Sequence, residues 1–108
     1  MDIVFVLEDD PLYAKQIEEA LREINPSLGI RLFTSLEEFY SLLKLIMAQG
    51  NKALSSADDE DVRVRAIVFK IEFIGVDRLH LLEKTQDVFL KKGLSSIESP
   101  TQFVVTAF

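Results

Sequence analysis

The chain of 108 residues contains no cysteine and no tryptophan, and it has a single histidine. The absence of cysteine excludes a disulfide framework, a thiolate zinc site and a cysteine nucleophile. One histidine also excludes a histidine cluster that could hold a metal ion. No apolar run reaches the length of about 18 residues that suggests a membrane-spanning helix, so we expect no membrane segment.

Basic residues are scarce, with 12 Lys and Arg against 18 Asp and Glu and a formal net charge of −6. Nucleic-acid binding relies on an excess of Lys and Arg that face the phosphates, so we expect no nucleic-acid partner. The first residues enter an apolar run without the basic region of a signal peptide, which favours a cytoplasmic location. The length predicts one domain, residues 1–108. A mean hydropathy of +0.17 is high for a small acidic domain, and it indicates either a core that is large for this length or apolar surface that a partner covers.

Apolar periodicity divides the chain into alternating strands and helices. We expect Asp10 to cap the first helix, Thr34 or Ser35 to cap the second, and Gly93 to end the third. The polar stretch 50–61 predicts a connection. Strands that alternate with helices predict a parallel sheet built from right-handed crossovers. The patterns predict strands at 3–7, 30–33, 62–69 and 103–107, and helices at 11–25, 36–46 and 76–91.

Side chains that could bind a ligand or take part in a reaction lie at the ends of three of the predicted strands. Glu8 and Asp9 come directly after the first strand, Lys70 follows the third, and Thr106 lies near the end of the fourth. Ligands of parallel α/β sheets bind at the carboxyl ends of the strands. We therefore expect these four residues to converge on one pocket.

Three segments resemble the receiver domain of two-component response regulators. They read VLEDDP at 6–11, KIEFIGVDRLHLL at 70–82 and VVTA at 104–107, and their order covers essentially the whole chain. The resemblance implies a flavodoxin-like fold with three layers and a parallel sheet. It also implies that Glu8 and Asp9 correspond to the acidic pair that holds Mg²⁺ in the family. Thr106 falls at the switch position that contacts the phosphoryl group.

The chain departs from the family at the phosphoacceptor position, where Lys70 replaces an aspartate. An ammonium group cannot form an acyl phosphate, and while protonated it cannot ligate a divalent cation. The usual Pro and Gly after the acceptor are Ile74 and Arg78 here. The fifth strand and the last two helices of the family have no counterpart, which leaves the strand order 2-1-3-4. We expect a degenerate, non-enzymatic receiver in which Lys70 pairs with Asp9 or Glu8 instead of a metal ion.

The last predicted strand is apolar and uncharged, and an exposed edge of this kind pairs readily with another chain. We expect a homodimer joined at Phe103, Val104 and Val105, or by mutual covering of bare sheet faces. A signalling protein, such as a sensor kinase or an output protein, is the expected partner. We expect no resident cofactor, and Glu8 and Asp9 are the candidate ligands should Mg²⁺ bind. Two alternatives stay open: a phosphoryl-accepting regulator, or a piece of a longer regulator.

Overall fold

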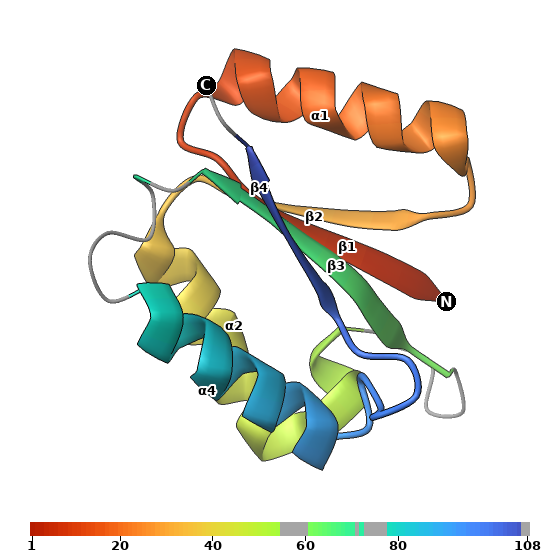
Figure 1. The fold of residues 1–108 in the computed structure, drawn as a ribbon, viewed down its shortest axis with the longest axis vertical. Helices are drawn as coiled ribbons and strands as arrows, with labels where there is room; N and C mark the ends of the chain where they lie inside the picture. The colour runs from red at the N-terminus through yellow and green to blue at the C-terminus, as the bar shows by residue number, and fades with distance from the viewer. Residues whose placement is uncertain (55–60, 71, 73–77, 107–108) are drawn as a thin grey trace.

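A four-stranded parallel sheet with the strand order β2-β1-β3-β4 organises the chain (Figure 1). The computed structural model describes residues 1–54, 61–70, 72 and 78–106. The observed sheet confirms the predicted α/β class, strand order and flavodoxin-like topology. The elements are β1 (Asp2–Leu7), α1 (Pro11–Ile24), β2 (Gly29–Phe33), α2 (Leu36–Gln49), the short 3₁₀ helix η1 (Gly50–Ala53), β3 (Arg63–Lys70), α4 (Arg78–Lys91) and β4 (Gln102–Thr106).

The observed boundaries lie within a few residues of the predicted ones. The main difference is the 3₁₀ helix η1, which lies at the start of the stretch 50–61, where the sequence predicts a connection. Several predictions fall outside the described residues: most of the acidic stretch 58–61, Ile74, the start of the third helix at 76, and Ala107 at the end of the fourth strand. Within the described part of the chain, no helix is long and apolar enough to cross a membrane.

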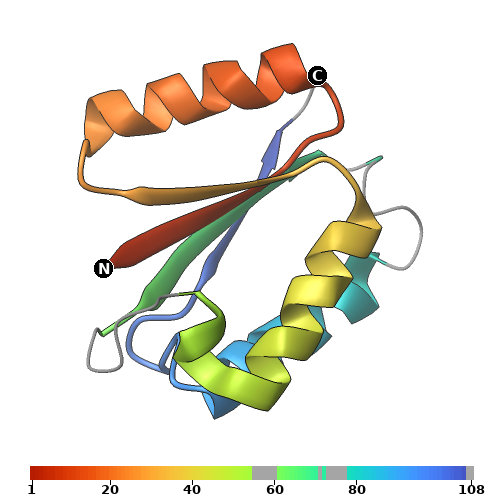
Figure 2. The same ribbon diagram turned by 180° about the vertical axis from the view of Figure 1, so that it is seen from behind.

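The helices form two layers on opposite faces of the sheet, with α1 on one face and α2 and α4 on the other (Figures 1 and 2). The larger core lies under α2 and α4, and the ring of Phe5 stands at its centre. Its centroid lies 5.4 Å from that of Phe33, 6.1 Å from Phe39 and 5.9 Å from Phe89, all edge to face. A smaller cluster that includes Val6 packs under α1. The unbroken apolar run of β1 follows from this position, because both of its faces are buried.

Local capping explains where the helices begin and end. Asp10 Oδ1 accepts hydrogen bonds from the backbone N–H groups of Leu12 and Tyr13, at 3.0 and 3.4 Å. Ser35 Oγ accepts one from the N–H of Glu38 at 3.2 Å. These contacts confirm Asp10 as the first cap and select Ser35 over Thr34 for the second.

The end of α4 is a Schellman motif. Gly93 has a φ of +73°, which costs a glycine little and other residues more. The N–H of Leu94 donates to the carbonyl oxygen of Phe89 at 2.9 Å, and the N–H of Gly93 donates to that of Leu90 at 3.3 Å. The predicted role of Gly93 is therefore confirmed, and the chain leaves α4 toward β4.

Strand β3 contains an irregularity that the alternating pattern does not reveal. Ile3 pairs with Val64 and Val4 pairs with Ala66, so Arg65 has no partner on β1. Val64 packs in the core under α2 and α4, whereas Ala66 packs in the cluster under α1. The bulge at Arg65 thus resets the alternation, and it aligns the carboxyl end of β3 with that of β1.

Candidate functional site

The site lies at the carboxyl end of the sheet, where Lys70 meets two acids. Lys70 is the last residue of β3, and its Nζ lies 3.9 Å from Oε1 of Glu8 and 3.7 Å from Oδ1 of Asp9. The sequence predicts that the Lys70 ammonium pairs with Asp9 or Glu8, and in the structure it lies within ion-pair distance of both carboxylates. Because β1 and β3 are neighbours in register up to Leu7 and Phe69, their ends bring these side chains together.

The two carboxylates differ sharply in their exposure to water. The side chain of Glu8 is 4% exposed and that of Asp9 is 63% exposed, while that of Lys70 is 29% exposed. Glu8 is fixed by the sheet, since its backbone N–H donates to the carbonyl oxygen of Phe33 at 3.0 Å. A carboxylate removed from water needs a compensating charge or hydrogen bonds. Lys70 supplies that charge from within the chain.

Thr106 lies on the strand next to this cluster. It is the register partner of Lys70 in the β3–β4 pair, as the convergence of the strand ends predicts. Its Oγ1 donates a hydrogen bond of 3.3 Å to the carbonyl oxygen of Phe69. The hydroxyl group is thus used within the sheet, one residue before Lys70, and it links β4 to the end of β3.

The donor set at this site does not fit Mg²⁺. The described residues contain no group of three His, Cys, Asp or Glu side chains that could hold a metal ion. Asp10, the third acid of the run, uses its carboxylate to cap α1. The remaining pair, Glu8 and Asp9, faces an ammonium group that adds positive charge where the ion would sit. Mg²⁺ needs free carboxylate oxygens and retained waters in an octahedral shell, and Lys70 competes for the same oxygens.

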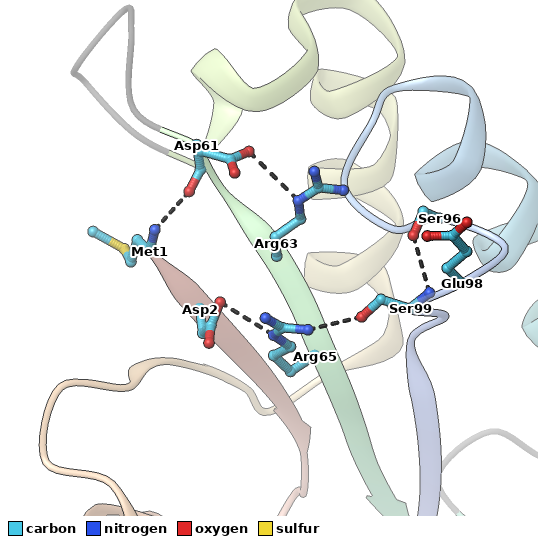
Figure 3. Close-up of a pocket in the computed structure, with 8 residues that line it drawn as sticks. All are labelled: Met1, Asp2, Asp61, Arg63, Arg65, Ser96, Glu98 and Ser99. Carbon is cyan, nitrogen blue, oxygen red and sulfur yellow. Dashed lines mark hydrogen bonds and ion pairs between the residues drawn. The ribbon is translucent and has the colours of Figure 1, made fainter.

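A hollow of about 410 Å³ lies at the opposite end of the sheet (Figure 3). Both of its arginines form ion pairs with acids. Arg65 Nε lies 3.1 Å from Oδ1 of Asp2, and Arg65 Nη1 donates to Oγ of Ser99 at 2.8 Å. Arg63 Nε lies 3.5 Å from Oδ1 of Asp61. Sequence reasoning missed this cluster, although the spacing of Arg63 and Arg65 is visible in the sequence. We interpret it as a tether that joins β1 and β3 to the turn before β4.

Comparison of the chain with protein-family models, with curated proteins and with solved structures gives no match. The class of protein is therefore defined by the fold and the site themselves. It is an α/β protein of flavodoxin-like topology, with two acids and a lysine in contact at the carboxyl end of its sheet.

Proposed function

We propose that the chain is a receiver-like module of two-component signalling that does not accept a phosphoryl group and acts through contacts with other proteins. The observation that carries the proposal is the position of Lys70 Nζ, within 4.0 Å of both Glu8 and Asp9. The flavodoxin-like strand order and the placement of Thr106 beside Lys70 support it.

The chemistry of aspartyl phosphorylation explains why Lys70 is decisive. The reaction needs a carboxylate nucleophile, and a divalent cation that offsets the charge developing on the transferred group. A protonated amine has no free electron pair to attack phosphorus. Its charge also makes the two carboxylates weaker ligands for a cation. With both requirements unmet, the site is not switched by phosphorylation, and surface contacts carry the signal.

A formal charge of −6 disfavours nucleic acid, so the proposed partners are proteins: a sensor kinase, an output protein or a second copy. A cytoplasmic location fits this role.

A phosphodonor assay tests the proposal. The protein is incubated with acetyl phosphate and MgCl₂, and its intact mass is then measured. We expect no species that carries an added phosphoryl group, because position 70 offers no carboxylate. The variant Lys70→Asp is the matched control, and we expect it to gain one phosphoryl group at position 70. Phosphorylation of the wild-type chain at a carboxylate would favour the alternative of a phosphoryl-accepting regulator.

A further inference from the structure

The outer side of β4 is an open edge in the described part of the chain. β4 pairs with β3 over Ala66 to Lys70 and has no second neighbour there (Figure 1). Val104 and Val105 are 45% and 48% exposed. Proteins commonly protect such edges with charged residues or proline, and the segment Gln102–Thr106 contains neither. The opposite edge, β2, carries a charge at its centre, Arg31.

The sequence of β4 is self-complementary. Read in either direction from Val104, it runs through an apolar residue to a polar one: Val105 and Thr106 on one side, Phe103 and Gln102 on the other. In an antiparallel pair centred on Val104, Phe103 would face Val105 of the second strand, and Gln102 would face Thr106. Pairs of an aromatic and a β-branched residue are among the favourable cross-strand pairs, and no like charges oppose each other.

We propose that the occupant of this edge is a second copy of the chain, paired antiparallel along β4 with its twofold axis at Val104. The proposal rests on the proposed function, since it names the protein contact of the module. The interface is isologous, so the β4 edge of each copy is fully paired in the dimer and is not available to a third copy. The charged β2 edges lie at the two ends of the resulting sheet and disfavour further growth.

A groove beside the edge gives the partner a place to pack. It measures about 750 Å³ and lies between α4 and the start of β4, with Leu82, Leu90 and Phe103 among its lining residues. The ring of Phe103 packs against the larger core and also lines this groove. In the proposed register the second copy brings its Val105 opposite Phe103. Apolar surface on both residues would then be removed from water, which favours association.

The net charge predicts how the dimer responds to salt. Each copy carries a formal charge of −6, whereas the paired strands are uncharged. Association therefore brings like charges together without ion pairs across the strands. Added salt screens this repulsion, so we expect the dimer to tighten as ionic strength rises. An interface built on ion pairs would weaken instead.

Single-cysteine variants test the register, because the chain has no cysteine of its own. In the proposed pair the two copies of position 104 face each other at a Cα separation of about 4.5–5.5 Å, within disulfide range. The two copies of position 105 are diagonal neighbours about 7–8 Å apart, which is beyond easy bridging. We expect Val104→Cys to form a disulfide-linked dimer under mild oxidation, well ahead of Val105→Cys. Leu45→Cys, at a site on α2 that is 47% exposed, measures random collision.

Sedimentation equilibrium of the full chain tests the dimer itself. We expect a monomer–dimer equilibrium whose dissociation constant rises about 10- to 100-fold in Val105→Lys. Leu45→Lys is the matched control, since Leu45 and Val105 are 47% and 48% exposed, and it should leave the constant unchanged. Circular dichroism establishes that each variant is folded, and the nearly isosteric Val104→Cys covers the case in which a lysine unfolds the chain.

Several outcomes would overturn the inference. They are a wild-type monomer at all concentrations, equal crosslinking at positions 104 and 105, and equal weakening by both lysine variants. None of them affects the phosphodonor result, so a failure of the dimer is distinguishable from a failure of the proposed function. Conversely, phosphorylation of the wild-type chain would overturn the proposed function and leave the β4 register to be judged by crosslinking alone.

Discussion

Replacing Lys70 with methionine is expected to lower the free energy of unfolding by about 2–3 kcal/mol at neutral pH. The substitution removes the ammonium group and leaves the Glu8 carboxylate, whose side chain is 4% exposed, without its positive neighbour. Breaking a buried ion pair by removing one partner costs about 3–5 kcal/mol. We expect a smaller loss here because the side chain of Lys70 is 29% exposed and Asp9 remains largely in water.

The cause of that loss is the buried Glu8 carboxylate, which keeps its charge and loses its positive neighbour in the variant. Urea unfolding of wild type and variant at neutral pH, at one protein concentration, measures the difference in the free energy of unfolding.

Two further variants sharpen this test. Lys91→Met removes an ion pair with Asp87 that is shorter, at 3.1 Å, but exposed on both sides, so its cost should stay within about 1 kcal/mol. Adding Glu8→Gln to Lys70→Met removes the unpaired charge, and we expect it to recover part of the lost stability. A loss that Glu8→Gln does not relieve would mean that Lys70 acts through packing alone.

Truncation of Phe5 to alanine is expected to lower the free energy of unfolding by about 3–5 kcal/mol, which is more than the loss in Lys70→Met. Phe5 is 0% exposed and makes edge-to-face contacts with three other rings. The cavity would open between the sheet and both helices of the larger core, where rigid rings cannot readily collapse into it. Since domains of this size are stable by only about 5–15 kcal/mol, the variant should lie close to unfolding at 37 °C.

Matched substitutions separate the cavity from the loss of apolar surface. Phe5→Leu keeps much of the volume and should cost far less than Phe5→Ala. Leu45→Ala removes apolar atoms at a site that is 47% exposed, and it should change stability by less than about 1 kcal/mol. Thermal unfolding of all three at one concentration gives the ranking. A cost for Phe5→Ala equal to that of Leu45→Ala would contradict the described core.

The fold could be predicted from the sequence because its local signals agree with its tertiary structure. The apolar run at 3–7 is a strand buried on both faces, and Asp10, Ser35 and Gly93 mark helix ends by chemistry that is local to the chain. The bulge at Arg65 could not be predicted, because it depends on how β3 meets β1 and leaves no local signal. The 3₁₀ helix η1 was missed because four residues carry too little periodicity.

The candidate site was predictable in part. The convergence of parallel strand ends predicts that Glu8, Asp9 and Lys70 lie together, and the three side chains are in contact. The burial of Glu8 beside an exposed Asp9 was not predictable, because consecutive acids after a strand look alike in sequence. The hydrogen bond from Thr106 to the carbonyl oxygen of Phe69 was equally hidden, since it depends on the spacing of β3 and β4.

In the proposed function, the Lys70 ammonium takes the place of a metal ion beside Glu8 and Asp9. The most direct test is a MgCl₂ titration of ¹⁵N-labelled wild type and Lys70→Asp, followed through the backbone amide signals of residues 8–10. We predict no saturable shift of these signals in the wild-type protein and a saturable shift in Lys70→Asp, whose three carboxylates would meet without the lysine. Saturable Mg²⁺ binding by the wild-type protein, as tight as that of the variant, would mean that Lys70 does not take the place of a metal ion.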